Sequence, residues 1–365
     1  MIRIVFISLV VVHGLIHFFG FAKAFGLATL PQLTVPISKP IGVAWLMAGV
    51  LSLSTAVALL LTPRWWWVLG ALALITSQAV IVSSWSDARF GTIANVILLL
   101  GAVYGFLSRG PPSLPAEYER AQTLAGPAHE AEVLTEADLK ALPEPVQRYV
   151  RRAGVVGQPR VQNFSASWVG RIRASPADPW MSFTAEQLNT LDTPRRFFLM
   201  DATMKGLPVD VFHAFDEHGA TMRVRLLSAK TMVDAKGEVL TRSETVTLFN
   251  DLCLFAPGEL VRSSVTWEPI DARSARAHFT LGANTITATL FFDETGELVD
   301  FRSDDRSATP EGKTDVMPWT TPVHDFATVG PARVPTKAEV KWHPDTGAWT
   351  YGEFELKRLA YNVGQ

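Results

Sequence analysis

Four apolar stretches in the first third of the chain limit its fold more than any other feature. They are Ile4–Leu27, Ile41–Leu61, Trp65–Ser83 and Thr92–Leu107. Each is about 16–24 residues long, and about 20 helical residues cross a hydrocarbon core of roughly 30 Å. They also lack the polar stripe of a helix on a soluble protein. The sequence therefore predicts an α-helical bundle of four membrane spans over residues 1–109. Three spans are the alternative, because the fourth stretch is short.

The segments between these stretches fit the same interpretation. Proline-containing or polar breaks lie at Pro31–Pro40, Pro63-Arg64 and Ser86–Arg89. Trp65-Trp66-Trp67 follows the second break and is typical of the aromatic belt at a membrane surface. A cleaved signal peptide is the alternative for the first stretch, because Ala22-Lys23-Ala24 resembles a cleavage site. We expect a span instead, because the apolar run is long for a signal and further spans follow at once.

Positive charges leave the orientation of the predicted bundle nearly balanced. With four spans, Arg3, Arg64 and Arg109 lie on one side of the membrane and Lys39 and Arg89 on the other. We expect a multi-pass protein of the cell membrane, with the lipid bilayer as its first partner. We place the soluble part outside the cytoplasm only because carriers of the kind considered below usually work there.

Two histidines, His13 and His17, share one face of the first predicted span. Ionisable groups inside a membrane are expensive and often functional, which makes this pair a weak candidate for metal or haem binding or for proton transfer. Two ligands do not complete a coordination shell, and the later spans contain no histidine. We therefore expect neutral imidazoles that hydrogen-bond to Ser77, Gln78 or Asn95, and we assign no metal and no other cofactor.

Charge and cysteine content exclude several classes of function for the rest of the chain. Residues 1–109 contain six basic side chains but one acid, Asp87, so nearly all 35 acidic residues of the chain follow them. A mildly acidic part without a basic run argues against nucleic-acid binding. Cys253 is the only cysteine, which excludes an intramolecular disulfide and a cysteine-based zinc site.

A change in composition at Gly110 marks the end of the membrane domain. We interpret residues 110–134 as a linker in which three prolines prevent a helix, namely Pro111, Pro112 and Pro115. Thr135, with Asp138 three residues later, is typical of a helix start. Pro143 and Pro145 divide the following segment, so two short helices are expected before Gly154. The soluble domain is assigned to residues 135–365.

Alternation of apolar and polar residues predicts that this domain is mostly β-structure. It is clearest in Phe164–Arg173 and recurs in Thr221–Leu226, Ala275–Leu281 and Asn284–Phe292. Asp-x-x-Gly turns predict hairpins, as does one variant: Asp216–Gly219, Asp234–Gly237, Asp293–Gly296 and Pro344–Gly347. Apolar residues at helical spacing predict one short helix, Leu248–Phe255, with Asn250-Asp251 as a candidate cap. The expected fold is α+β: a curved antiparallel sheet, or half-barrel, with a few short helices.

The predicted sheet has bulky side chains on one face and few helices to cover that face. Such a sheet either packs a closed core or leaves an apolar groove for a ligand. The candidates for a ligand cavity are Trp168, Phe183, Phe198, Phe215, Phe279, Phe292 and Trp319. Trp319 lies in a proline-rich connection from Ser303 to Pro335, which includes Pro310 and a candidate short strand at His324–Phe326.

A search for catalytic motifs finds no nucleophile elbow, phosphate-binding loop, dinucleotide fingerprint or His-Glu-x-x-His. His129-Glu130 lacks the second histidine. Asp304-Asp305-Arg306 is interpreted as a solvated turn rather than an acid–base pair. The histidines of the soluble part, including His213, show no ligand spacing. The sequence thus gives no reason to assign an enzymatic activity, and we name no catalytic residue.

Several segments resemble an uncharacterised bacterial family of multi-pass membrane proteins that ends in a domain of unknown function. They are His13–Phe21, Leu142–Tyr149, Trp267, Pro318-Trp319 and Val340–Trp342. More loosely, residues 160–360 resemble the LolA-like lipoprotein-carrier half-barrel, chiefly through Ser264–Asp300. That second resemblance implies an open antiparallel sheet wrapped round helices and an apolar ligand. The membrane domain at the N-terminus departs from it.

Three functions remain open at this stage. The first is binding or transfer of a lipid or other apolar ligand by a membrane-anchored β domain. The second is a structural or sensory envelope protein that docks a protein partner through exposed apolar patches. The third is a membrane enzyme without a recognisable motif.

Overall fold

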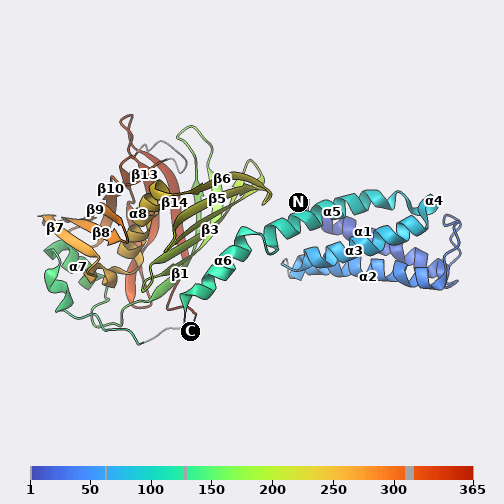
Figure 1. The fold of residues 1–365 in the computed structure, drawn as a ribbon, viewed down its shortest axis with the longest axis horizontal. Helices are drawn as coiled ribbons and strands as arrows, with labels where there is room; N and C mark the ends of the chain where they lie inside the picture. The colour runs from blue at the N-terminus through green and yellow to red at the C-terminus, as the bar shows by residue number, and fades with distance from the viewer. Residues whose placement is uncertain (1, 62–63, 127–129, 309–315, 365) are drawn as a thin grey trace. The chain divides into compact units, whose positions relative to one another are not determined.

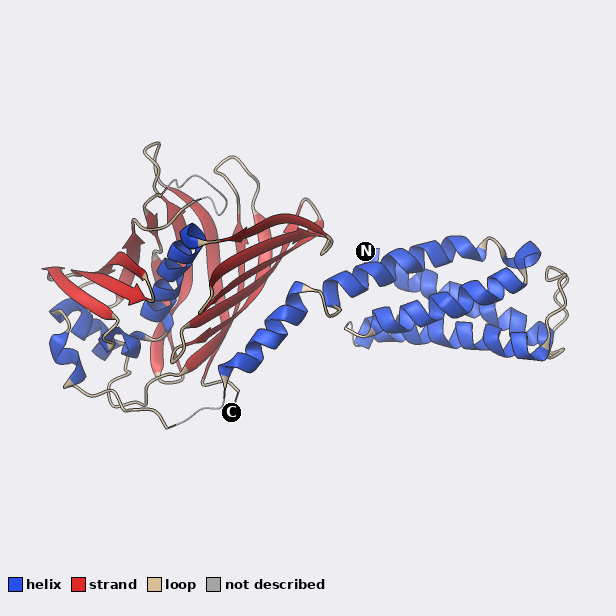
Figure 2. Ribbon diagram, in the orientation of Figure 1, coloured by secondary structure: helices blue, strands red, loops and turns tan. Residues whose placement is uncertain are grey.

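The computed structural model describes residues 2–61, 64–126, 130–308 and 316–364 (Figure 1). The chain forms two compact units, Met1–Glu117 and Tyr118–Gln365. The first is entirely helical and loop, and the second is built around one large sheet (Figure 2).

Four long apolar helices make up most of the first unit, as predicted. They are α1 (Ile2–Ala24), α2 (Lys39–Leu61), α3 (Trp66–Ser83) and α5 (Gly91–Arg109), with the short α4 (Trp85–Ala88) between the last two. By length and composition each of the four could cross a membrane. Apolar side chains such as Leu61, Ile75 and Leu100 are exposed on the bundle surface, as expected of helices that face lipid rather than water.

Small residues bring α1 and α2 close together. A Cβ atom added to Gly20 would lie 2.2 Å from the Trp45 ring, and one added to Gly49 would lie 3.0 Å from the Gly14 carbonyl oxygen. Close backbone approach of this kind is typical of helices packed in membranes. Within the tryptophan run, Trp65 is exposed but Trp66 is buried and packs edge-on against Phe6 at 5.7 Å. Trp66 therefore belongs to the bundle interior rather than to an interfacial belt.

The segment interpreted as a linker contains helical structure that the sequence analysis missed. Helix α6 spans Leu114–Gln122 and is followed by the 3₁₀ turn η1 (Thr123–Ala125). Pro115 does not prevent α6 because it occupies the first turn, where a missing N–H breaks no helical hydrogen bond. The two short helices expected next are present as η2 (Asp138–Ala141) and α7 (Glu144–Arg152). Their start is fixed by Asp138, which accepts hydrogen bonds of 2.7 Å from the backbone and the hydroxyl of Thr135.

The second unit contains one highly curved sheet, in agreement with the predicted fold. Every pairing among the described strands is antiparallel, in the order β6-β5-β4-β3-β2-β1-β14-β13-β11-β10-β9-β8-β7. The strands are β1 (Asn163–Ile172), β2 (Met181–Thr190), β3 (Arg195–Met204), β4 (Leu207–Asp216), β5 (Gly219–Leu226), β6 (Lys230–Lys236), β7 (Val265–Asp271), β8 (Ser274–Leu281), β9 (Asn284–Phe292), β10 (Leu298–Ser303), β11 (Trp319–Thr320), β12 (Val323–Val329), β13 (Ala332–Trp342) and β14 (Trp349–Tyr361).

The predicted turns close hairpins at three of the four positions. Asp216–Gly219 joins β4 to β5, Asp293–Gly296 joins β9 to β10, and Pro344–Gly347 lies between β13 and β14. The glycines take positive φ angles, for example +85° at Gly296. Asp234–Gly237 is the exception, because it ends β6 and leads into a helix instead of a strand.

That helix, α8 (Glu238–Phe255), lies within the curve of the sheet (Figure 2). It contacts β5 and β6 from one end of the strand order as well as β13, β10 and β9 from the other, so the sheet wraps round it. Every residue from Ser243 to Phe255 is buried. The helix is longer than the predicted Leu248–Phe255, because burial stabilises a first half rich in Ser and Thr that has little helical propensity. The 3₁₀ turn η3 (Pro257–Val261) follows it.

Irregularities in the strand register explain part of the curvature. The β1–β14 pairing shifts between Ser167 and Trp168, and the β13–β14 pairing shifts between Val340 and Lys341. Bulges of this kind bend a strand and increase its twist. The proline-rich connection supplies β11 and β12, which pair in succession with β13, and β12 contains the predicted strand His324–Phe326. Pro310 in the same connection lies outside the described residues.

Candidate functional site

A cavity of about 420 Å³ lies between α8 and the concave face of the sheet. Its walls come from α8, from the neighbouring strands β1, β2, β3, β4, β5, β13 and β14, and from the connection between β10 and β11. Cavities of this size are typical of small-molecule sites. The two walls of this cavity differ in chemistry.

The sheet supplies an aromatic wall. Trp168, Phe198 and Phe354 converge from β1, β3 and β14, with ring centroids 6.1 Å apart for Trp168–Phe354 and 6.5 Å apart for Phe198–Phe354. On β13 and β14, Trp342 stacks on Tyr351 at 5.4 Å. Aromatic side chains in such numbers provide a large apolar surface that can contact a ligand.

Helix α8 supplies a polar wall opposite these rings. Five polar side chains recur at helical spacing and line the cavity: Ser243, Glu244, Thr247, Asn250 and Asp251. The other side of the helix is apolar, and Phe249 stacks on Phe279 of β8 at 4.9 Å. These polar side chains of α8 therefore face an internal cavity rather than bulk water.

Buried ion pairs organise the polar wall. Arg196 of β3 donates to Asp251 Oδ2 at 2.7 Å and lies 3.4 Å from Glu244 Oε2. Gln187 and Asn189 of β2 also donate to Asp251, at 2.8 and 3.2 Å. Burial raises the pKa of Asp251 even though Arg196 favours its charged form. The several donors compensate for much of the cost of burying this carboxylate.

Glu244 is the second buried carboxylate and has three basic neighbours. His213 Nδ1 lies 3.3 Å from Glu244 Oε1, and Arg306 Nη2 lies 3.9 Å from the same oxygen. Burial by itself would raise the pKa of Glu244, but His213, Arg196 and Arg306 together lower it to about 2. Glu244 is therefore ionised at neutral pH.

The seven aromatic residues proposed from the sequence as cavity candidates do not all lie together. Trp168, Phe198 and Trp319 line this cavity. Phe279 lines a different one. The other three, Phe183, Phe215 and Phe292, are buried in the core of the domain without lining either.

Sequence reasoning missed the polar part of the site. Asn250-Asp251 was considered as a helix cap, but both residues lie within α8 and are buried. Arg306 was assigned to a solvated turn, yet its side chain is 14% exposed and lines the cavity. A polar residue every three or four positions between Ser243 and Asp251 was the one available signal, and it resembled a solvated helix face.

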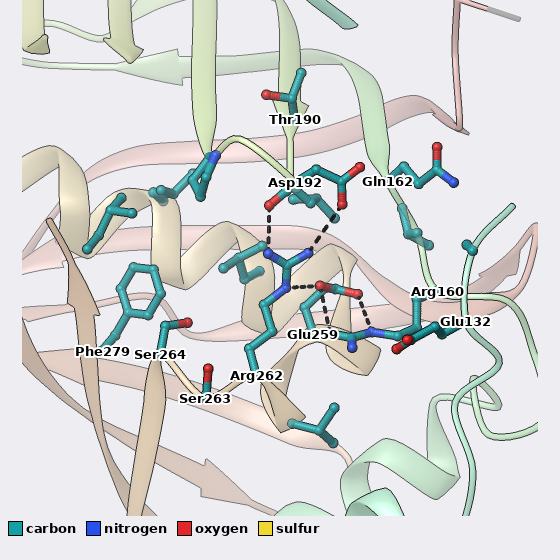
Figure 3. A pocket seen from close by; sticks show the side chains of 18 of the residues that line it. Glu132, Arg160, Gln162, Thr190, Asp192, Glu259, Arg262, Ser263, Ser264 and Phe279 are labelled. Atoms are coloured by element: carbon teal, nitrogen blue, oxygen red, sulfur yellow. Dashed lines mark hydrogen bonds and ion pairs between the residues drawn. The ribbon is translucent and has the colours of Figure 1, made fainter. Parts of the chain in front are cut away.

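A second cavity, of about 710 Å³, lies beside the C-terminal half of α8 (Figure 3). Both of its arginines pair with carboxylates. Glu259 accepts two hydrogen bonds of 3.1 Å from Arg160 and another from Arg262, which in turn lies 3.9 Å from Asp192 (Figure 3). Phe279 lies at the edge of this group. Four carboxylates but two arginines line this cavity, and about half of its surface is apolar. Because both arginines are already paired with carboxylates, we assign no ligand to it.

The two histidines of α1 hydrogen-bond to later helices of the bundle. His13 Nε2 lies 3.1 Å from Ser77 Oγ and 3.0 Å from Asn95 Oδ1, and His17 Nε2 lies 2.9 Å from the same hydroxyl. Asn95 in turn donates to Gln78 at 2.9 Å. Within the part of the chain that the structure describes, no three His, Cys, Asp or Glu side chains are grouped as a metal site.

A known protein family matches most of the second unit. The model of a family of unknown function, DUF6544, matches residues 132–354. The chain belongs to this family. The match covers α8, both walls of the cavity and nearly the whole sheet. In this member of DUF6544, the domain with the cavity follows four apolar helices in the sequence. No curated protein matches the sequence.

Solved structures similar to this DUF6544 chain are distant from it in sequence. A LolA superfamily protein from Nitrosomonas europaea is 9% identical, with a TM-score of 0.34 over 59% of this chain and 90% of its own. An outer membrane lipoprotein-sorting protein domain from Vibrio parahaemolyticus is 10% identical, with a TM-score of 0.32 over 56% and 86%. A DUF1329 family protein from Desulfovibrio piger is 12% identical, with a TM-score of 0.28 over 56% and 88%.

Proposed function

We propose that the protein is anchored in a membrane by α1, α2, α3 and α5 and that its β domain binds a lipid or another amphipathic small molecule in the cavity beside α8. This proposal rests on one observation: the cavity has an aromatic wall on the sheet and a polar wall on α8. The rings of the sheet face the polar side of α8 across about 420 Å³. A ligand with an apolar chain and a polar end would match both.

The energetics favour an occupied cavity. Each methylene group moved from water to an apolar surface contributes about 0.8 kcal/mol. Polar atoms on α8 lose hydration by burial, and a ligand's polar end restores hydrogen bonds to them. Asn250 is 5% exposed, and its Oδ1 atom has no hydrogen-bond partner in the described part of the chain. A polar group of a bound ligand would supply the hydrogen bond that this buried atom lacks.

Transfer of the ligand between membranes would require more than binding. A domain that shares its chain with four apolar helices stays near the bilayer that supplies lipid. We therefore favour binding at a membrane, or passing the ligand to an acceptor there, over diffusion of the whole protein as a soluble carrier.

The test is photo-crosslinking in the full-length protein. The chain is placed in nanodiscs of phosphatidylcholine with a fatty acid methyl ester that carries a diazirine on its chain, and the labelled peptides are identified by mass spectrometry. We expect labels on α8 and on the cavity side of β1, β3 and β14 in addition to labels on the bundle. Labels confined to the bundle would contradict the proposal.

A cavity-filling variant supplies the control. Ala338 lines the cavity from β13, and Ala338→Trp should displace the probe and remove the label from α8. Val299 of β10 is 37% exposed and does not line the cavity, so Val299→Trp should leave the label unchanged. Equal labelling of α8 in both variants would mean that the probe does not occupy this cavity.

A further inference from the structure

Arg306 sits in an unusual environment for a guanidinium group. It follows β10 in the connection to β11, and its side chain is only 14% exposed. The Arg306 Cζ atom lies 4.5 Å from the ring centroid of Trp319 and 5.8 Å from that of Trp342. Stacking on aromatic rings uses the face of a guanidinium but leaves the N–H groups on its edge free to donate.

These N–H groups are unused within the described residues. Arg306 donates no hydrogen bond from its side chain there, and its nearest carboxylate oxygen is Glu244 Oε1 at 3.9 Å. Glu244 is already shared, because Arg196 lies 3.4 Å and His213 3.3 Å from its oxygens. A largely buried guanidinium therefore retains donors that the protein does not satisfy.

The charges around the cavity favour an anion. Arg173, Arg196, Arg306 and Lys337 line it, against two carboxylates, Glu244 and Asp251. Arg196 pairs with both carboxylates, and Lys337 pairs with Asp325 at 2.6 Å. Arg173 forms no ion pair within the described residues and donates to the carbonyl oxygen of Thr350 at 2.9 Å. Positive charge thus exceeds negative charge along the cavity wall.

A second polar group of the cavity also lacks a partner. Thr321 follows β11 and is 2% exposed, and its hydroxyl has no hydrogen-bond partner in the described part of the chain. A hydroxyl can donate to an oxygen of a ligand. Thr321 and Arg306 both belong to the proline-rich segment from Ser303 to Pro335, on either side of residues 309–315, which are not described.

We propose that Arg306 binds the anionic head group, a carboxylate or a phosphate, of the amphipathic ligand in this cavity. The proposal rests on the proposed function and specifies its ligand class. The guanidinium donates in-plane hydrogen bonds to two oxygens of the head group, and the aromatic wall holds the chain. Thr321 and Asn250 line the same cavity, and their unpartnered polar atoms are further groups that a polar ligand would satisfy.

The experiment compares three competitors with the same twelve-carbon chain. The full-length protein in phosphatidylcholine nanodiscs is labelled with the neutral diazirine methyl ester, and dodecanoate, dodecyl phosphate or methyl dodecanoate is added to displace it. We expect dodecanoate, dodecyl phosphate or both to displace the label on α8 at a concentration at least tenfold lower than methyl dodecanoate. The difference between the two anions identifies whether the site prefers a carboxylate or a phosphate.

Arg306→Gln should abolish this preference, so that the three competitors act within about threefold of one another, while displacement by methyl dodecanoate stays unchanged. Arg302→Gln is the matched control, because Arg302 is 45% exposed and pairs with Asp304 outside the cavity. It should behave as the wild type. The thermal unfolding midpoint of each variant, compared with that of the wild type, shows whether it is folded.

Three results would overturn the proposal. If the neutral competitor acts as well as the anions on the wild type, the cavity binds ligands but Arg306 does not select their charge, and only the inference fails. An unchanged preference in Arg306→Gln has the same meaning. If the neutral probe never labels α8, the proposed function fails together with the inference.

Discussion

At the scale of single residues, the pKa values of two carboxyl groups in the β domain, one buried and one half-buried, shift in opposite directions. Glu244 is held ionised by its basic neighbours, with a pKa of about 2. At Asp300 of β10, burial outweighs two backbone hydrogen bonds and the charges of Lys341 and Arg302, and it raises the pKa to about 6. The lowered pKa of Glu244 stabilises the folded state at pH values above about 4.5, which is its pKa in the unfolded chain. This stabilisation is lost as the pH falls toward 2. The raised pKa of Asp300 has the opposite effect. It stabilises the folded state at pH values below about 3.8, its pKa in the unfolded chain, and this stabilisation is lost as the pH rises through 6.

Asp300→Asn should therefore stabilise the protein at neutral pH. The variant removes a charge that is costly to bury. A pKa shift from 3.8 to about 6 corresponds to about 3 kcal/mol for a fully buried group. Because Asp300 is half-buried, solvent screening reduces the expected gain to about 2 kcal/mol, or roughly 4–8 °C in the unfolding midpoint. At pH 4 the difference should nearly vanish, because the carboxyl group is then protonated in the folded state. Thermal unfolding of the full-length protein in detergent at both pH values measures it.

The control for this prediction is an exposed aspartate. Asp304 is 66% exposed, so Asp304→Asn should change the unfolding midpoint little at either pH. A midpoint for Asp300→Asn that stays at or below the wild-type value at pH 7 would mean that Asp300 is not penalised by burial.

At the scale of elements, the sequence predicted strands and spans better than the central helix. Alternation in Phe164–Arg173 and continuous apolar runs such as Ile41–Leu61 are local signals, and both elements formed close to their predicted bounds. The first half of α8 has no such signal, since its helical state depends on the sheet that surrounds it. Asp234–Gly237 shows the same limit, because a turn sequence does not determine whether a strand or a helix follows.

Gly170 offers a test of the β1–β14 pairing beside the cavity. A Cβ atom at this position would lie 2.1 Å from the Glu353 carbonyl oxygen and 2.6 Å from the Phe183 ring. Gly170→Ala should therefore destabilise the domain by about 1–3 kcal/mol, because a backbone atom cannot move aside. Chemical or thermal unfolding of the full-length protein gives the change.

Gly258 in η3 is the matched control. Its added Cβ would lie 3.5 Å from the nearest atom, on the side chain of Leu134, which is ordinary contact. Gly258→Ala should shift the free energy of unfolding by no more than about 0.5 kcal/mol. Equal stability of the two alanine variants would show that β1 and β14 approach each other less closely than described.

At the scale of the whole molecule, the chain joins an apolar helical bundle to a β domain whose interior is not uniformly apolar. The sequence predicted both parts, because hydropathy and alternation are local properties. It did not predict the site, which brings Arg196 of β3, Asp251 of α8 and Arg306 of the connection after β10 to one cavity. These residues are far apart along the chain, so they form no local sequence pattern. Hydropathy predicts that charged residues are exposed, and it therefore does not detect charges that are buried as ion pairs.

The most direct test of a ligand-binding cavity is native mass spectrometry of the full-length protein released gently from detergent micelles. The account predicts one bound small molecule per chain in the wild type and in Val299→Trp, and its loss in Ala338→Trp. Lipids held by the bundle would remain in all three and serve as the internal reference. A wild-type chain that carries no adduct beyond those of Ala338→Trp would contradict the account.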